Sequence, residues 1–380
     1  MLLLGLASPF MGAQTQSASQ PAASPVWQME ESGTTAGLRG IYSVDGQIAW
    51  ASGTEGTVLR TVDGGQHWQR CATPDGDKDG ATLDFRGVQA WDAKTAIVMA
   101  SGPGEKSRLY KTTDGCGTWK LLFTNPDKDG FWDAVRFDGH NDGMILGDPV
   151  KGAFAVFVTF DGGENWKGQK LRGLKADFSR QAVFAASNSS LLMWTALSHR
   201  IFVSGGKGGA FVYECYGELS AGAHPENVDC LRNRKNLPLS GGIESAGAFS
   251  VDYRPLHSPY PEIIFKGGGG TYQTYQSMVV VGGDYMKPSE ATGTAAYSVD
   301  FGDHWTASQQ PPHGYRSSVQ WSEQEKLWIT VGTNGSDVSR DDGKTWQPVD
   351  DGNWNALSLP LVVGPKGRIA RLNPVALPKP

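Results

Sequence analysis

An eight-residue pattern occurs five times in this chain of 380 residues and restricts the folds open to it. The pattern is Ser or Thr, any residue, Asp, any residue, Gly, any two residues, and Trp. Its aspartates are Asp63, Asp114, Asp161, Asp300 and Asp341, and its tryptophans are Trp68, Trp119, Trp166, Trp305 and Trp346. In the second copy, Cys116 stands in place of the glycine. A fixed repeat of this kind predicts an architecture of similar units packed side by side.

Each copy predicts a β-hairpin turn. The carboxylate accepts backbone N–H bonds, the glycine adopts a positive φ, and the tryptophan packs between neighbouring sheets. We therefore assign the five aspartates a structural and not a catalytic role. The pattern resembles the Asp-box (bacterial neuraminidase, BNR) repeat, which lies between the third and fourth strands of propeller blades. Each copy is called an Asp box below.

Strand patterns surround each box at a period of about 45 residues, which matches a four-stranded blade. Around the first box we expect strands at residues 38–44, 47–51, 57–61 and 68–71. The chain has 50 glycines and no long stretch with helical periodicity. These features predict an all-β propeller that forms a single domain over residues 25–380.

The boxes leave a gap between Asp161 and Asp300 that must contain at least one further blade. Residues 178–186, 200–204 and 209–214 supply three strands of a blade whose box has decayed at Cys215-Tyr216. Residues 217–242 and 254–275 are interpreted as insertions, within one inserted region around 215–275. The alternative makes residues 250–253 a second decayed box and adds a blade.

The two ends of the chain complement each other. Residues 353–359, 361–363 and 368–372 form three strands without a box, and residues 26–30 form a single strand. Trp27-Gln28 also repeats the Trp-Gln pair found at Trp68 and Trp346. We expect the N-terminal strand to complete the last blade and close the ring, because closure removes exposed sheet edges. This arrangement gives seven blades, with six or eight as alternatives.

The first 24 residues are typical of a secretory signal and flexible leader, because a short apolar run from Met1 to Ala7 precedes small residues. The alternative is a disordered tail. The signal predicts a periplasmic or secreted protein. No later apolar run reaches the roughly 18 residues that span a bilayer, so we expect no transmembrane segment in the mature chain. The net charge of -5 argues against a nucleic-acid partner.

The chain offers no convincing metal site. Its four cysteines lack zinc-site spacing. In an oxidising compartment, Cys215 can pair with Cys230, and Cys71 can join Cys116 in the neighbouring repeat; buried free thiols are the alternative. The run from Asp75 to Gly80 matches the start of a calcium loop, but Arg86 stands where the bidentate glutamate belongs. We expect a solvated loop there, and no metal or cofactor.

The candidate site lies on the face opposite the boxes, where the innermost strands begin. Arginines occupy this position in four expected blades, namely Arg39, Arg86, Arg180 and Arg316. Converging guanidinium groups would bind a carboxylate, a phosphate or an acidic peptide. The alternative is that each arginine pairs with a nearby carboxylate such as Asp84 or Asp133. Turns on the same face add second-rank candidates, which are Asp148, Asp284, Tyr285 and Lys287.

Several sequence segments outside the Asp boxes indicate a family. Residues 85–88, 147–149, 282–293 and 364–369 resemble the bacterial relatives of the photosystem II stability/assembly factor, and the resemblance runs from about Trp27 to Leu372. It implies an exported, non-enzymatic, seven-bladed scaffold that binds a protein client through its arginine-rich face. The client is membrane-associated in one version of this hypothesis, and the scaffold is expected to be a monomer. The segment 215–275 departs from the family pattern.

Other classes of protein also use Asp boxes. A sialidase-like glycoside hydrolase combines an arginine cluster with a tyrosine nucleophile and an aspartate acid/base. The Phe/Tyr-Arg-Ile-Pro phrase of that family is absent here, since glycine follows both Arg39 and Arg86. A glycan- or peptide-binding receptor module is the second alternative.

Overall fold

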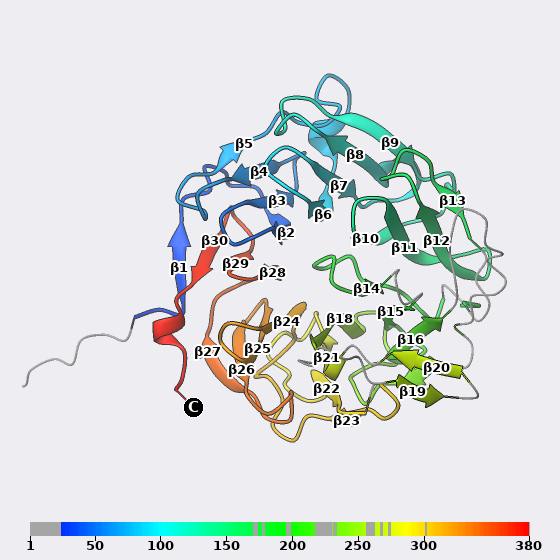
Figure 1. The fold of residues 1–380 in the computed structure, drawn as a ribbon, viewed down its shortest axis with the longest axis vertical. Helices are drawn as coiled ribbons and strands as arrows, with labels where there is room; N and C mark the ends of the chain where they lie inside the picture. Colours follow the sequence, from blue (N-terminus) through cyan, green and yellow to red (C-terminus); the bar gives the residue numbers. More distant parts are fainter. Residues whose placement is uncertain are drawn as a thin grey trace, which may run out of the picture.

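The computed structural model describes residues 24–169, 174–176, 179–194, 199–216, 230, 234–255, 263–266, 269–272, 275–300 and 302–379. These residues form a ring of β-sheets around a central axis (Figure 1). The helical residues among them form three-residue 3₁₀ turns, namely η1 (Gly80–Thr82), η2 (Gly104–Lys106) and η5 (Pro374–Ala376). No helix in this part of the chain is long and apolar enough to cross a membrane.

The ring consists of seven four-stranded antiparallel sheets, so the predicted seven-bladed β-propeller is confirmed. In each of the first six blades the strands follow chain order from the axis outward. Blade one contains β2 (Leu38–Ser43), β3 (Ala49–Gly53), β4 (Val58–Thr61) and β5 (Gln69–Arg70). Blade two contains β6 (Phe85–Ala90), β7 (Ala96–Ala100), β8 (Arg108–Thr112) and β9 (Lys120–Thr124). Blade three contains β10 (Trp132–Asp138), β11 (Asp142–Val150), β12 (Ala153–Thr159) and β13 (Lys167–Gly168).

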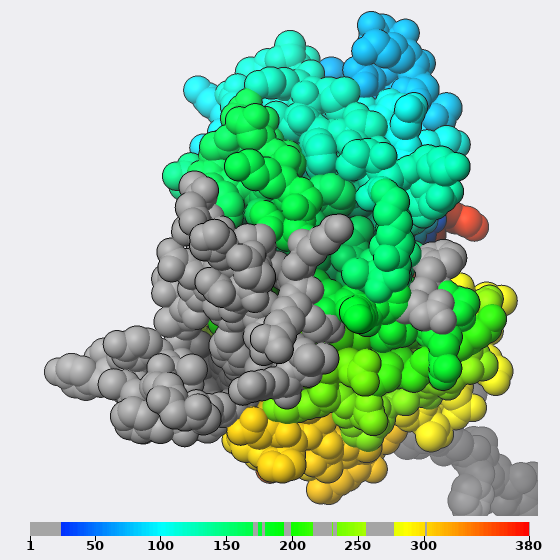
Figure 2. Space-filling model, turned by 90° about the vertical axis from the view of Figure 1, so that its right-hand side faces the viewer, coloured from blue at the N-terminus to red at the C-terminus, as the bar shows by residue number. Residues whose placement is uncertain are grey.

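The second half of the ring repeats this plan with one addition. Blade four contains β14 (Leu191–Trp194), β15 (His199–Ser204), β16 (Phe211–Tyr216) and β17 (Arg234–Asn236). Blade five contains β18 (Ala246–Pro255), β21 (Tyr275–Asp284), β22 (Ala295–Ser298) and β23 (Thr306–Ala307), with the hairpin β19 (Ile263–Lys266) and β20 (Gly269–Tyr272) inserted between its first two strands. Blade six contains β24 (Ser318–Ser322), β25 (Leu327–Gly332), β26 (Gly335–Ser339) and β27 (Gln347–Asp350). Figure 2 shows the successive blades following one another along the rim, from cyan through green to yellow.

The last blade joins the two ends of the chain. It contains β28 (Ala356–Ser358), β29 (Leu361–Val363), β30 (Ile369–Leu372) and, as its outer strand, β1 (Trp27–Glu30). Trp27 pairs with Leu372 and Glu30 with Ile369 in an antiparallel register (Figure 1). The predicted closure by the N-terminal strand is therefore confirmed.

Blades four and five correct three details of the sequence interpretation. The innermost strand of blade four is β14, whereas residues 178–186, as far as they are described, make only one isolated bridge, between Ala182 and Gly205. Residues 250–253 lie inside β18 and are not a second decayed box. Part of the segment 217–242 belongs to the blade, since β17 is its fourth strand. The hairpin β19–β20 does lie in the expected insertion 254–275.

The Asp boxes form the predicted turns. In the first box the Asp63 carboxylate accepts hydrogen bonds from the His67 N–H at 3.0 Å and from the Thr61 hydroxyl at 2.8 Å. The other four boxes repeat both bonds. The bond donated by the His67 N–H is the largest cause that holds the pKa of Asp63 at about 2. The role of the aspartate is thus to fix a turn.

The tryptophans of the boxes pack between blades to different degrees. Trp346 is buried, with 1% of its surface exposed, while the other four are half-buried. Trp119 of blade two meets Trp50 of blade one edge-on, with ring centroids 6.4 Å apart. Buried apolar clusters such as that of Trp50, Val98 and Tyr110 fill the space between adjacent sheets. The core therefore consists of layers between blades.

The boxes mark one face of the ring, called the box face below. The Gly64 N–H donates to the carbonyl of Gln47, which places the first box beside the turn that follows the innermost strand β2. The same contact recurs between Gly115 and Lys94 and between Gly162 and Asn141. The innermost strands consequently begin at the opposite face, as predicted.

Two disulfides have the pairings considered from the sequence. Cys71 follows β5 in blade one and is bonded to Cys116 in the box of blade two, with Cα atoms 5.2 Å apart. Cys215 in β16 is bonded to Cys230, with Cα atoms 4.2 Å apart. The first bond connects neighbouring blades, and the second connects blade four to residues inserted after β16.

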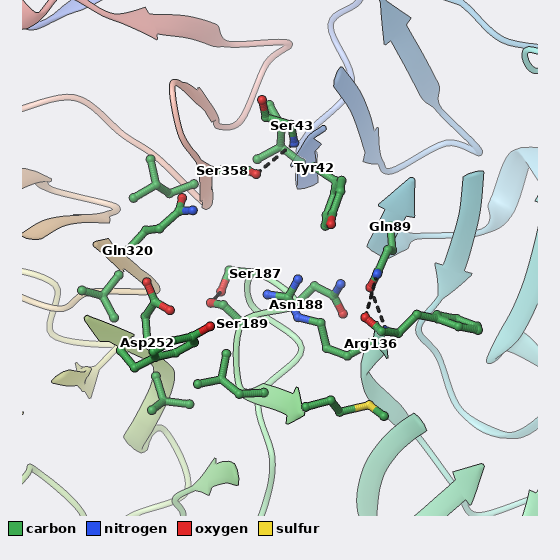
Figure 3. Close-up of a pocket in the computed structure, with 18 residues that line it drawn as sticks. Tyr42, Ser43, Gln89, Arg136, Ser187, Asn188, Ser189, Asp252, Gln320 and Ser358 are labelled. Atoms are coloured by element: carbon green, nitrogen blue, oxygen red, sulfur yellow. Dashed lines mark hydrogen bonds between the residues drawn. The ribbon is translucent and has the colours of Figure 1, made fainter. Parts of the chain in front are cut away.

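Residues 182–190, called the axial segment below, cross the centre of the ring before β14 begins. Ser187 donates to the Ser317 carbonyl at 2.7 Å, and Ser189 donates to the Ser250 hydroxyl at 2.7 Å. The Asn188 side chain accepts a bond from the Val135 N–H at 2.8 Å. Figure 3 shows Ser187, Asn188 and Ser189 at the centre of a pocket. The axial segment lines one pocket on each face of the ring.

Candidate functional site

The face opposite the boxes carries a pocket of about 530 Å³. It is called the arginine pocket below, and its described lining residues include Arg39, Arg86, Phe131, Asp133, Asp148, Phe184, Phe249, Tyr285 and Tyr315. Most of these residues lie at or just before the start of an innermost strand. The volume falls within the range of roughly 300–1,000 Å³ that is usual for ligand sites.

Two arginines and one carboxylate form the polar side of this pocket. The Arg86 Nε donates to Asp84 Oδ2 at 2.9 Å, and the Arg39 Nε lies 3.5 Å from Asp84 Oδ1. The two guanidinium groups therefore share one carboxylate. Burial lowers the pKa of Arg39, partly offset by Asp84, but the group stays charged because its ordinary pKa is far above neutrality. Both side chains remain partly exposed, Arg39 at 37% and Arg86 at 27%.

Two further carboxyl groups line the pocket from blade three. Burial raises the pKa of Asp133 well above its usual range, and the nearby Asp148 raises it further. Burial also raises the pKa of Asp148 to about 6. Asp148 accepts a bond from the Val183 N–H at 3.0 Å and so holds the axial segment in place. Lowering the pH through about 6 protonates Asp148 and so makes the pocket more positive.

Aromatic rings form the opposite side. Phe184 of the axial segment stacks on Phe249, with ring centroids 3.9 Å apart. Tyr315 meets Phe249 edge-on at 4.8 Å, and Tyr285 lies 6.2 Å from Phe249 and is 46% exposed. The Arg86 guanidinium lies 5.9 Å from the ring of Phe131. The pocket thus combines positive charge with apolar surface.

Four of the eight predicted site residues do not line the described pocket, and Arg316 differs most from the prediction. Its side chain is fully buried in an ion pair with Asp337. It also donates to the Tyr315 carbonyl at 2.7 Å and to Asn334 Oδ1 at 2.6 Å. The prediction that its guanidinium faces a partner is wrong, because Asp337 on β26 supplies an internal carboxylate. For Arg316, the alternative interpretation of the sequence, in which the arginine pairs with a carboxylate of its own chain, is therefore correct. The partner is Asp337, whereas Asp84 and Asp133 are the carboxylates considered from the sequence.

The other three, Arg180, Asp284 and Lys287, are also absent from the described lining. Arg180 is exposed in a turn before the axial segment and does not start an innermost strand. Asp284 is buried at 5% exposure and accepts a bond from the Met286 N–H at 3.0 Å, which fixes the turn after β21. Lys287 is exposed in that turn. The predicted convergence of four arginines is therefore limited to Arg39 and Arg86.

The carboxylates of the acidic loop at Asp75 act between blades. Asp79 binds Arg108 of blade two at 2.7 Å, and Asp75 accepts a bond from the Tyr110 hydroxyl at 2.8 Å. In the described part of the chain no three Asp, Glu, His or Cys residues form a metal-binding group.

The sequence interpretation missed the aromatic side of the pocket. Phe131 and Tyr315 stand one or two residues before the strand-start positions Asp133 and Arg316. This spacing is a usable signal, because residues flanking a strand start reach the same face. Phe184 gave no such signal, since it reaches the pocket only through the unexpected course of the axial segment.

Comparisons with known proteins place this geometry in context. No family model matches the chain. It is 23% identical over 308 residues to "Photosystem II assembly lipoprotein Ycf48" of Synechococcus sp. (strain CC9902), covering 76% of this chain and 82% of the relative. The solved structure of YCF48 from Cyanidioschyzon merolae matches with a TM-score of 0.57 and 18% identity, over 92% of this chain and 99% of that one. A structure of YCF48 bound to D1 peptide matches with a TM-score of 0.55 and 17% identity, over 92% of this chain and 97% of that one.

Proposed function

Since this chain is a photosystem II assembly factor-like β-propeller, we propose that it is an exported, non-enzymatic protein that binds an acidic segment of a client protein. The client segment occupies the arginine pocket. Support for a peptide ligand comes from the related YCF48 structure, which is bound to D1 peptide. The client of this chain is defined here only by its chemistry, as a segment with carboxylates and at least one aromatic or aliphatic side chain.

The observation that carries the proposal is the pairing of Arg39 and Arg86 on a single carboxylate. Asp84 neutralises one of the two charges, and both guanidinium groups are partly exposed. Each retains donors that Asp84 does not use, and charge-assisted bonds to a carboxylate are among the strong hydrogen bonds of proteins. The facing rings of Phe249 and Tyr285 offer apolar contact to the rest of a peptide.

The chemistry of the pocket favours binding over catalysis. A sialidase-type nucleophile requires an activated tyrosine assisted by a glutamate. Burial raises the pKa of Tyr315, which is the opposite of activation, and the described lining residues include no glutamate.

Export is supported by the two disulfides, because such bonds persist in oxidising compartments. We therefore propose that the protein acts in the periplasm or outside the cell. The apolar N-terminal run that motivates the signal lies outside the described residues. Expression of the full chain with a fused alkaline phosphatase reports on this directly, since phosphatase activity requires an exported fusion, and an inactive fusion contradicts export.

The binding proposal is tested with a fluorescein-labelled peptide containing aspartate, glutamate and phenylalanine, and a matched peptide in which Asn and Gln replace the acids. Binding is followed by fluorescence anisotropy. The acidic peptide should bind more tightly than the neutral one, and its affinity should fall as salt rises. The double variant Arg39→Glu/Arg86→Glu should weaken it at least tenfold, which corresponds to about 1.4 kcal/mol.

The control is Arg180→Glu, which makes the same change of charge at an exposed arginine outside the pocket. It should leave the affinity within about twofold. Equal weakening by Arg180→Glu would mean that overall charge, and not the pocket, attracts the peptide. Equal binding of the neutral peptide would refute the acidic client.

A further inference from the structure

The box face carries a second pocket, which the arginine pocket does not reach because the axial segment lies between them. This box-side pocket has a volume of about 340 Å³ and is lined by side chains from the ends of the innermost strands (Figure 3). Its polar lining includes Tyr42, Arg136, Asp252 and Gln320. Nothing in the proposed client binding uses these groups.

Arg136 on β10 brings a positive charge into this pocket. Its Nε donates to the Leu191 carbonyl at 3.2 Å, and no other hydrogen bond of its side chain is present among the described residues. Its two terminal nitrogens therefore keep their donors available. Burial lowers the pKa of Arg136, while Tyr42 and Asp252 act in the opposite direction. An arginine stays charged under these conditions, so its burial requires a polar or anionic partner.

Asp252 on β18 enters the pocket from the opposite side (Figure 3). Its Oδ2 accepts a bond from the Trp321 N–H at 2.8 Å, and the backbone of Tyr253 also donates to the carboxylate. Burial raises the pKa of Asp252 to about 6. No ion pair within 4.0 Å joins Asp252 to Arg136 in the described part of the chain. A cation and a carboxylate thus face one pocket without neutralising each other directly.

We propose that the box-side pocket binds a small zwitterion, whose carboxylate contacts Arg136 and whose ammonium group contacts Asp252. A guanidinium group can hold a carboxylate through two parallel N–H bonds, and a carboxylate accepts from an ammonium group. A zwitterion satisfies both charges at once, whereas an anion or a cation leaves one of them unpaired. Free amino acids are the ligand class that carries these two groups.

The size and access of the pocket agree with such a ligand. Its volume lies at the lower end of the roughly 300–1,000 Å³ range of small-molecule sites. A neighbouring pocket shares Ser43 and Gln320 with it and continues along the turns of blades six, seven and one. This continuity provides a route from the box face. On the inner side, Asn188 has its side chain fully engaged with the backbone of Val88 and Val135 and closes the pocket.

The test is isothermal titration calorimetry of the full mature chain at pH 7.5, a pH at which Asp252 is ionised. The probes are free α- and ω-amino acids of two to six carbons, with alkyl carboxylates and alkylammonium ions of matching length. At least one zwitterion should bind saturably and at least tenfold more tightly than either matched single ion. Binding should weaken as the pH falls through about 6, because Asp252 then loses its charge. The other ionisable side chains of the described lining are Tyr42, Arg136 and Tyr253.

Variants separate the two contacts. Asp252→Asn should remove the preference for zwitterions over carboxylates, and Arg136→Gln should abolish binding while Arg136→Lys restores part of it. Arg180→Gln, which removes an exposed arginine outside both pockets, is the matched control and should not change the affinity. Absence of saturable binding by every zwitterion at about 10 mM, in the range of the weakest specific affinities, would overturn the proposal. So would a single ion that binds as tightly as the zwitterion of the same length.

Discussion

Removing the Trp27 side chain tests the closure of the ring by β1. Trp27 is 3% exposed, meets Trp354 at 6.1 Å between ring centroids, and donates from Nε1 to the Ser336 hydroxyl at 2.8 Å. Truncation of a buried tryptophan to alanine costs about 3–5 kcal/mol, and the lost hydrogen bond adds about 1 kcal/mol. Trp27→Ala should therefore lower the free energy of unfolding by about 4–6 kcal/mol, a large share of the 5–15 kcal/mol typical of folded proteins.

The measurement is urea unfolding followed by circular dichroism, so that the signal does not depend on tryptophan fluorescence. Trp27→Phe is the matched control, because it keeps an aromatic ring against Trp354 but cannot bond to Ser336. We expect it to cost about 1–3 kcal/mol. A loss below about 1 kcal/mol for Trp27→Ala would refute the reasoning, since the ring would then be equally stable with β1 poorly anchored.

Four other predictions concern the boxes, the arginine pocket and the first disulfide. Trp346→Ala should cost about 3–5 kcal/mol in urea unfolding, and Trp166→Ala should cost less, because Trp346 is buried and Trp166 is half-buried; the reverse order would contradict this assignment. Burial raises the pKa of Asp148 to about 6, so the folded protein favours the protonated carboxyl group. The contribution of Asp148 to the free energy of unfolding is therefore highest below about pH 4 and falls as the pH rises through 6. Asp148→Asn should accordingly gain up to about 2–3 kcal/mol relative to the parent between pH 4 and pH 7, and equal differences at the two pH values would refute the shift. Reduction of the Cys71–Cys116 bond, which closes a loop of 45 residues, should cost about 4 kcal/mol in the loop-entropy model. Because Cys116 has a φ of 74°, Cys71→Ser/Cys116→Gly should be about 0.5–1 kcal/mol more stable than Cys71→Ser/Cys116→Ser in thermal unfolding.

The sequence predicted the ring well because its determinants are local. Each box places an aspartate, a glycine and a tryptophan within eight residues, and the hydrogen bonds of Asp63 lie within that span. Closure was also predictable, since Trp27-Gln28 repeats a local pair and the last blade lacked a strand.

The site was predicted less well because its determinants are distant in the chain. The sequence pattern gives Arg316 and Arg86 equivalent positions, but Asp337 lies 21 residues after Arg316 and is buried against it. Residues 178–186 contain enough apolar residues to be taken for a strand. Their continuation instead bonds to Val88, Val135, Ser250 and Ser317, which are spread over four other blades. Pattern alone does not indicate such contacts.

The axial segment changes how this ring is expected to unfold. In a repeat protein each unit contacts only its neighbours, so stability approximates a sum of nearest-neighbour terms and blades can detach in succession. Here Ser187 bonds to blade six, Asn188 to blades two and three, and Val251 of blade five donates its N–H to the Ser189 carbonyl. If any of these blades unfolds, the bonds that it makes with the axial segment, which leads into β14 of blade four, also break. The axial segment therefore couples blades that are not neighbours in the ring. This coupling favours a single cooperative unfolding transition over the stepwise unfolding of blades.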